Sequence, residues 1–142
     1  MASVTKRLLR ELQDVRKGLG EELISLEPVS DETLLYWRAV MRGPCDTPYS
    51  TGTFVIHIDI PEQYPIKPPM LTFVTPVCHP NVHFETGEIC LDILKAQWSP
   101  AWTLASIPLN CDAANLLRCG DILGYNNLVR LYTRMFAQDP AC

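Results

Sequence analysis

Residues 53–60 alternate between apolar and polar side chains more regularly than any other part of this chain. Four bulky apolar residues stand two positions apart: Phe54, Ile56, Ile58 and Ile60. Between them lie Val55, His57 and Asp59, which would point to the opposite face of an extended strand. The pattern therefore predicts a strand with one buried face and one face toward solvent, and it places His57 on the solvent face. Such strands are typical of antiparallel sheets.

Three further strands are expected at residues 23–26, 33–41 and 70–74. In the second of these, one face carries Leu35, Trp37, Ala39 and Met41. The prolines of residues 61–69 exclude a helix or the interior of a sheet from that segment. The connections are short, so we expect successive strands to pair as a four-stranded antiparallel meander.

A helix is expected at residues 4–19, where apolar residues recur at steps of three and four: Val4, Leu8, Leu12, Val15 and Leu19. Charged residues fall largely on its other faces, which we expect to be exposed: Arg7, Arg10, Glu11, Asp14 and Lys17. Two more helices are expected at residues 111–118 and 121–136. One helix, then a meander, then C-terminal helices indicates an α+β fold.

The composition is that of one globular domain spanning residues 1–142, with 47% hydrophobic and 20% charged residues. A net charge of -4 argues against a broad basic surface for nucleic acid. Basic residues do concentrate in the first seventeen positions. A solvated helix face explains them more simply than a docking face for an acidic partner does.

The six cysteines contain no CxxC pair, so we expect free thiols in a reducing compartment, with no metal site and no cofactor. No apolar stretch is long enough to span a bilayer, and no signal segment follows Met1. We therefore expect a cytoplasmic protein without direct membrane insertion.

Residues 79–102 carry the side chains best suited to chemistry. A His79-Pro80-Asn81 turn is followed by a Thr86-Gly87 pair and then by Cys90. Cysteine is strongly nucleophilic near neutral pH, which makes Cys90 a candidate nucleophile. A lone cysteine is, however, more often a small buried hydrophobe.

A set of motifs in a fixed order decides between these interpretations. They are Lys6-Arg7-Leu8, Trp37, Gly43-Pro44-x-x-Thr47-Pro48-Tyr49, Tyr64-Pro65-x-x-Pro68-Pro69, His79-Pro80-Asn81, Gly87-x-Ile89-Cys90-Leu91-Asp92 and Trp98-Ser99-Pro100. In this order, over nearly its whole length, the chain resembles the ubiquitin-conjugating enzymes. The resemblance implies their fold, in which an active-site loop lies between the sheet and the C-terminal helices.

The resemblance also implies an acyl transferase in an ATP-dependent pathway. Cys90 would accept ubiquitin as a thioester, and Asn81 would donate a hydrogen bond to the oxyanion formed on transfer. The alternative for Asn81 is that it only braces its turn. His79, Pro80, Asp92 and Trp98 would be active-site scaffold, and His83 would be exposed and uninvolved.

The implied partners are ubiquitin, its activating enzyme and a RING-type ligase. Ligase contacts would fall at Arg7, Ile66, Pro100 and Ala101, although Ile66 could instead pack against Pro100. Arg118-Cys119-Gly120-Asp121 and the short loops are most similar to the peroxisomal branch of the family. That branch implies a peroxisomal import receptor as substrate and a membrane anchor protein of the peroxin-22 type, at the cytosolic face of the peroxisome.

The chain departs from the family pattern at Ile107-Pro108. The family continues from Trp-Thr-Leu into a long crossover helix, yet here Ser106-Ile107 runs directly into Pro108-Leu109-Asn110. We expect that a segment of a dozen or more residues is missing from the sequence at this junction. A true internal deletion is the alternative.

Three other functions remain open on the residues alone. The chain could be a cytosolic conjugating enzyme for ubiquitin or a ubiquitin-like modifier without a peroxisomal role. It could be a cysteine hydrolase pairing Cys90 with His79 or His83, which requires a histidine within hydrogen-bond reach of the thiol. It could also be a non-catalytic binding module of the same fold.

Overall fold

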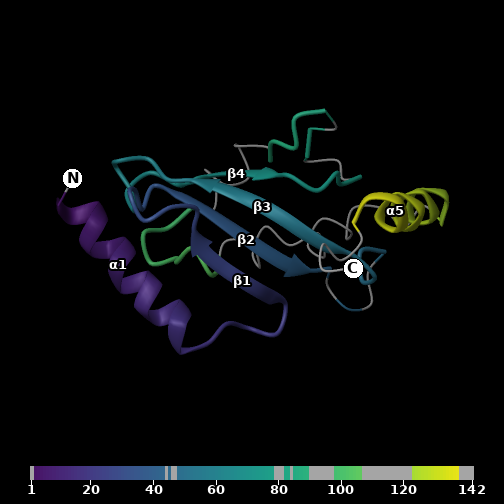
Figure 1. The fold of residues 1–142 in the computed structure, drawn as a ribbon. Helices are drawn as coiled ribbons and strands as arrows, with labels where there is room; N and C mark the ends of the chain where they lie inside the picture. Colours follow the sequence, from purple (N-terminus) through teal and green to yellow (C-terminus); the bar gives the residue numbers. More distant parts are fainter. Residues whose placement is uncertain are drawn as a thin grey trace.

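The computed structural model describes residues 2–43, 45, 48–78, 82–83, 85–89, 98–106 and 123–137. Its elements, in chain order, are α1 (Ala2–Lys17), β1 (Leu23–Pro28), β2 (Tyr36–Arg42), β3 (Thr53–Asp59), β4 (Met70–Phe73) and α5 (Leu123–Phe136). The predicted α+β fold is confirmed, with its N-terminal helix, four-stranded meander and final helix (Figure 1). The helix expected at residues 111–118 and the Ile107-Pro108 junction lie outside the described residues.

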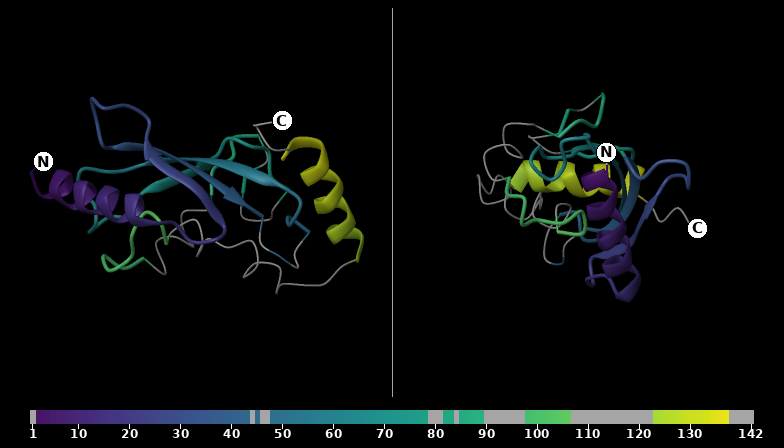
Figure 2. Two further views of the ribbon diagram at one scale, coloured as in Figure 1. Left: turned by 60° about the horizontal axis from the view of Figure 1, so that its bottom comes forward. Right: turned by 90° about the vertical axis from the view of Figure 1, so that its left-hand side faces the viewer.

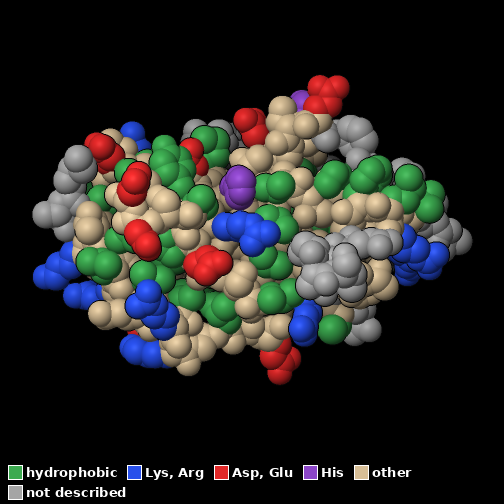
Figure 3. Space-filling model, in the orientation of Figure 1, with side chains coloured by type: hydrophobic (Ala, Val, Ile, Leu, Met, Phe, Trp, Pro, Cys, Tyr) green, Lys and Arg blue, Asp and Glu red, His purple; other side chains and the backbone are tan. Residues whose placement is uncertain are grey.

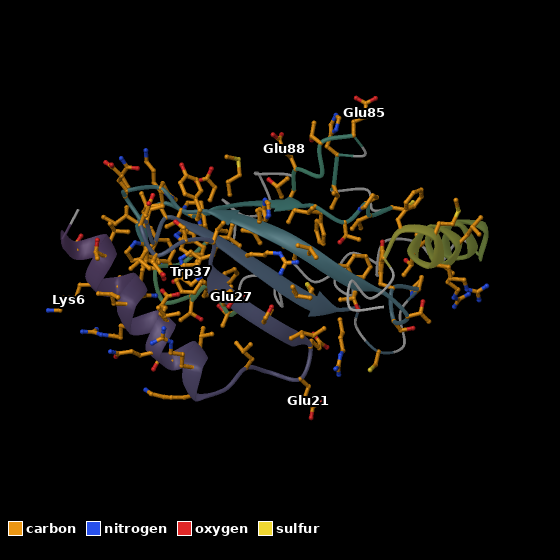
Figure 4. The ribbon with its side chains drawn as sticks, viewed as in Figure 1. Lys6, Glu21, Glu27, Trp37, Glu85 and Glu88 are labelled. Atoms are coloured by element: carbon orange, nitrogen blue, oxygen red, sulfur yellow. The ribbon has the colours of Figure 1, made fainter. Side chains whose placement is uncertain are left out.

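The strands pair in chain order, β1-β2-β3-β4, and every pair is antiparallel. On one face of the sheet, Trp37 pairs with Ile58 and Ala39 with Ile56, and each of these residues is at most 1% exposed. The indole N–H of Trp37, labelled in Figure 4, donates to the Leu34 carbonyl at 2.7 Å. This face holds the hydrophobic core, as the alternation of residues 53–60 predicts.

The opposite face of the sheet carries a polar row that crosses all four strands in register: Glu27, Arg38, His57 and Thr72. Figure 3 shows charged side chains and a histidine on this face, and His57 is exposed as predicted. Val55 also points to this side, but it is only 9% exposed. The chain following β4 pairs beside it, since the Val74 N–H donates to the Val55 carbonyl and the Val55 N–H donates to Thr75 Oγ1.

The predicted start of the second strand is wrong by three residues. The Leu35 N–H donates to Thr33 Oγ1 at 3.2 Å, so residues 33–35 form a turn and β2 begins at Tyr36. The first strand is longer than predicted, because β1 stays paired with β2 as far as Pro28, opposite Trp37.

Helices α1 and α5 lie at opposite ends of the sheet (Figures 1 and 2). Helix α1 contributes Val4 and Leu8 to the core. Helix α5 buries Val129 and Thr133, and the Ala137 carbonyl that follows it accepts a hydrogen bond from the Thr53 N–H at 2.8 Å. No helix within the part of the chain that the structure describes is long and apolar enough to cross a membrane.

Candidate active site and docking surface

A hairpin at residues 82–89 leads the chain into the candidate nucleophile. Val82 bridges Ile89, and the His83 N–H donates to the Glu88 carbonyl at 2.8 Å. Gly87 has a φ of +73°, and a Cβ at this position would lie 2.1 Å from the Phe73 carbonyl oxygen. Only glycine fits, because both the left-handed backbone and the close approach exclude a side chain.

The returning strand of this hairpin is attached to the edge of the sheet. The Phe73 N–H donates to the Gly87 carbonyl at 2.8 Å, and the Ile89 N–H donates to the Leu71 carbonyl at 3.3 Å. Ile89 is 8% exposed and joins the core. Glu85 and Glu88 project from the hairpin away from the sheet (Figure 4). The backbone is therefore held against β4 up to the residue that precedes Cys90.

Five residues expected at the active site lie outside the described residues: His79, Pro80, Asn81, Cys90 and Asp92. The residue before the first of them is well anchored, because the Tyr49 hydroxyl donates to the Cys78 carbonyl at 2.7 Å. The segments leading into both halves of the candidate site are thus attached to the folded core. His83 is exposed, and its Nδ1 accepts a hydrogen bond from the Thr86 N–H at 3.3 Å.

Cys78 is a free, half-buried thiol, and burial raises its pKa above the ordinary value. A raised pKa lowers the thiolate fraction near neutral pH, so Cys78 is a poor nucleophile there. Cys45 is free and exposed on a loop. Among the described residues, no group of three or more His, Cys, Asp or Glu side chains could hold a metal ion.

Trp98 connects the segment after the candidate nucleophile to the loop before β4. Its indole N–H donates to the Pro65 carbonyl at 2.9 Å. Its ring contacts Tyr64 and Trp102, with centroid distances of 5.9 and 6.0 Å. The structure thus places Trp98 as a packing anchor between two loops, and its role as active-site scaffold stays a prediction.

The four residues expected to contact a ligase come from three segments that are bonded together at the α1 end of the molecule. Arg7 Nη2 donates to the Pro100 carbonyl at 3.1 Å and to the Trp102 carbonyl at 2.8 Å. Pro100 and Ala101 are exposed, and Ile66 is 79% exposed. An isoleucine this exposed is not packed against its own loop. We call Arg7, Ile66, Pro100 and Ala101 the docking surface.

The expectation that Glu11 faces solvent is wrong. It is 5% exposed, and its carboxylate accepts hydrogen bonds from Arg7 Nε at 2.6 Å, the Tyr64 hydroxyl at 2.7 Å and the Leu104 N–H at 2.8 Å. Its charge alone assigned Glu11 to the outside, since it stands seven residues after Val4 and so lies at the edge of the apolar face. The three donors compensate its burial. The four-residue spacing of Arg7 and Glu11 was the one available sign of their pairing.

This cluster shifts the ionisation of its members. The hydrogen bond to Glu11 raises the pKa of Arg7. Burial, followed by the hydrogen bond to Glu11, raises the pKa of Tyr64 far above its ordinary value, although the nearby Arg7 acts in the opposite direction. The Arg7 guanidinium lies 5.9 Å from the centroid of the Tyr64 ring, within reach of a cation–π contact. Tyr64 is therefore held as a neutral hydrogen-bond donor.

Comparison with known proteins gives a consistent result. A sequence profile described as ubiquitin-conjugating enzyme matches residues 7–119. Protein PEROXIN-4 of Arabidopsis thaliana is 44% identical over 154 residues, covering 96% of this chain and 97% of the relative. Ubiquitin-conjugating enzyme E2 pex4 of Dictyostelium discoideum is 43% identical, covering 92% of this chain and 97% of the relative.

Two solved structures are similar in fold as well as in sequence. One is H. polymorpha ubiquitin-conjugating enzyme Pex4p in complex with the soluble domain of Pex22p, with a TM-score of 0.77, 36% identity and coverage of 95% of this chain and 98% of that one. The other is the E2 domain of a Toxoplasma gondii ubiquitin-conjugating enzyme, with a TM-score of 0.79, 34% identity and coverage of 94% and 99%.

The raised pKa of Tyr64 predicts a loss of stability in alkali. The folded chain keeps the Tyr64 proton at pH values where the unfolded chain releases it, so this contribution is fully present below about pH 10 and declines above it. Tyr64→Phe should make the fall in the free energy of unfolding less steep, by up to about 1.4 kcal/mol per pH unit. Urea unfolding between pH 8 and 11 measures this slope.

The control for this measurement is Tyr36→Phe, since Tyr36 is 51% exposed. It should leave the pH dependence close to that of the wild type. Equal slopes for the Tyr64→Phe variant and the wild type would contradict the prediction.

Proposed function

This chain belongs to the ubiquitin-conjugating enzyme family, and from that premise we propose that it carries ubiquitin as a thioester on Cys90 and passes it to a protein substrate. The family match over residues 7–119 carries this proposal, because it includes both Asn81 and Cys90. The hairpin supports it as well, since it secures the backbone to the sheet as far as Ile89.

The loading step is a thiol–thioester exchange. The Cys90 thiolate attacks the carbonyl carbon of ubiquitin's C-terminal thioester on the activating enzyme. The tetrahedral intermediate then collapses, and the thiolate of the activating enzyme leaves. The acyl group arrives already activated, so the step needs a thiolate but no dedicated general base. This accounts for a sequence without an evident Cys-His-Asp relay.

The transfer step places negative charge on the same carbonyl oxygen. A lysine amine or a cysteine thiolate of the acceptor attacks the Cys90 thioester, and the Cys90 thiolate leaves when the intermediate collapses. A lysine acceptor also gives up a proton. A preorganised amide donor aimed at the oxyanion contributes about 10²–10³ in rate. We assign this donor to Asn81, with His79, Pro80, Asp92 and Trp98 as its scaffold.

The docking surface is where we place the RING-type ligase. Ile66, Pro100 and Ala101 offer exposed apolar contacts beside the cationic Arg7, in a region that three chain segments hold together. Many family members have an aromatic residue where this chain has Ile66. Its aliphatic side chain thus favours a ligase with a shallower apolar pocket.

The relatives support a peroxisomal role. Both named relatives are called peroxin-4 or pex4, and the H. polymorpha enzyme was solved with the soluble domain of Pex22p. We propose that this chain modifies a peroxisomal import receptor at the cytosolic face of the organelle. A membrane anchor of the peroxin-22 type would recruit it there.

We also propose that a crossover segment is absent between Ile107 and Pro108 of the single domain. The alignment with the Arabidopsis relative runs over 154 positions, more than the 142 residues of this chain, so the relative has residues that this chain lacks. The Ser106 N–H donates to the Thr103 carbonyl at 3.0 Å, a first turn where the family's helix would begin. Sequencing the natural transcript across the Ile107 and Pro108 codons tests this: adjacent codons indicate a true deletion, and intervening codons indicate missing residues.

Cys90→Ala should abolish the adduct that forms with ubiquitin, activating enzyme and ATP. The wild type should give a band that reducing agent removes, as seen on non-reducing and reducing gels. Cys45→Ala is the matched control, because it removes another free cysteine from an exposed loop and should load normally. A wild type that forms no reducible adduct would contradict the thioester proposal.

Asn81→Ala should separate loading from transfer. Loading should stay within about threefold of the wild type, while discharge to free lysine should fall by about 10²–10³. Single-turnover discharge of the preloaded chain measures the second rate. If loading and discharge fall by the same factor, Asn81 acts by bracing its turn and not as an oxyanion donor.

Recruitment by the anchor should be visible in cells. Membrane fractions should contain more of this chain when a peroxin-22-type anchor is present than when it is deleted, because the chain's described helices include none that could span a bilayer. Fractionation followed by immunoblotting measures the ratio. Equal membrane fractions with and without the anchor would exclude this route and favour a conjugating enzyme without a peroxisomal role.

A further inference from the structure

The carboxylate of Glu11 is the shared acceptor of three chain segments that lie far apart in sequence. Its Oε1 accepts from Arg7 Nε in α1 and from the Tyr64 hydroxyl, 53 residues away. Its Oε2 accepts from the Leu104 N–H, 93 residues away. At 5% exposure, little of Glu11 is left for solvent. Both oxygens are therefore committed to protein donors.

Those three segments also carry the docking surface. Arg7 is one turn before Glu11 on α1, Ile66 follows Tyr64 by two residues, and Pro100 and Ala101 precede Leu104 on the same segment. Leu104 is fully buried, so its backbone cannot shift without disturbing the core. The position of the Glu11 carboxylate thus sets how far apart the three exposed parts of the surface lie.

Arg7 is committed inward as well. Its Nε bonds Glu11, its Nη2 bonds the Pro100 and Trp102 carbonyls, and its side chain is 28% exposed. Charge-assisted hydrogen bonds of this kind are about twice as strong as neutral ones. The Trp98 indole N–H, bonded to the Pro65 carbonyl, joins the two loops on their other side. The hydrogen bonds of Arg7 and Glu11 thus attach the surface to α1, and the Trp98 bond joins its two loops to each other.

We propose that Glu11 is a positioning residue of the docking surface: by holding the Tyr64 loop and the 98–106 segment against α1, it presets the geometry that a ligase recognises. The proposal rests on the proposed function only for the identity of the partner, because the hydrogen bonds of Glu11 do not depend on what the protein does. Removing the carboxylate weakens ligase binding and leaves the chemistry at Cys90 in place.

The test compares Glu11→Gln, Tyr64→Phe and the double variant. Glu11→Gln keeps one acceptor oxygen and loses the other, and Tyr64→Phe removes one donor. Asp14→Asn is the matched control, since Asp14 is an exposed carboxylate on the same helix whose partner is Lys17 at 2.7 Å. Thermal unfolding of each variant establishes that it is folded before it is assayed.

The functional readout is discharge of ubiquitin to free lysine at increasing concentrations of a RING domain, chosen from a panel because it accelerates the wild type. Glu11→Gln should raise the half-maximal RING concentration by about 3- to 30-fold and leave discharge without RING within about twofold. Tyr64→Phe should act in the same direction. The double variant should raise the half-maximal RING concentration by less than the product of the two single fold-changes, because both changes break the same link.

The structural readout needs no activity. In the nitrogen–proton NMR spectrum, the Trp98 indole proton should lose hydrogen-exchange protection in Glu11→Gln and keep it in Asp14→Asn. The proposal would be overturned if Glu11→Gln left the half-maximal RING concentration unchanged, or lowered the discharge rate equally with and without RING. A panel in which no RING domain accelerates the wild type would overturn it too. A wild type that never loads ubiquitin refutes the proposed function instead, and the indole measurement still decides whether Glu11 positions the loops.

Discussion

The surface at the α1 end of this molecule depends on one buried carboxylate. An ionised side chain loses most of its hydration when it is 5% exposed, and such burial is tolerable only if protein donors replace the water. Glu11 meets a guanidinium, a phenol and a backbone amide, one from each of three segments. Tyr64 stays protonated in this setting, and Arg7 gains an acceptor for its positive charge. The three side chains and the Leu104 amide therefore stabilise one another.

Backbone geometry organises the sheet edge that leads to the proposed active site. Gly87 turns the 82–89 hairpin through a left-handed conformation, in close contact with the Phe73 carbonyl. The Ile89 N–H then bonds to the Leu71 carbonyl of β4, so the backbone is attached to the sheet edge as far as the residue before Cys90. The proposed chemistry requires only a placed thiolate and an amide donor, and such a frame would suffice for it. At the docking surface, Trp98 plays a comparable part, because its indole N–H bonds to the Pro65 carbonyl.

Much of this fold could be predicted from the sequence, and the failures share a cause. Strict alternation identified β3 and the burial of Ile56 and Ile58, because apolar residues at every second position indicate a strand with one buried face. Glu11 was misassigned because two of its three donors, Tyr64 and Leu104, are 53 and 93 residues away. Val55 lies on the face that the alternation predicts, but its 9% exposure was not foreseen, and the chain after β4 pairs with its backbone. Local patterns report the preferences of a segment, and these positions are decided by segments that arrive later in the chain.

The topology of the sheet has a consequence for the order in which the molecule forms. Every strand pairs with its sequence neighbour, so the meander closes only short loops, and the entropy lost in closing a loop rises with its length. The bonds from Glu11 and Arg7 to residues 100–104 close loops of more than ninety residues. We expect the sheet to be assembled before these bonds are made. The proposed docking surface is then a late product of folding, and a ligase that binds there would select chains whose core has already formed.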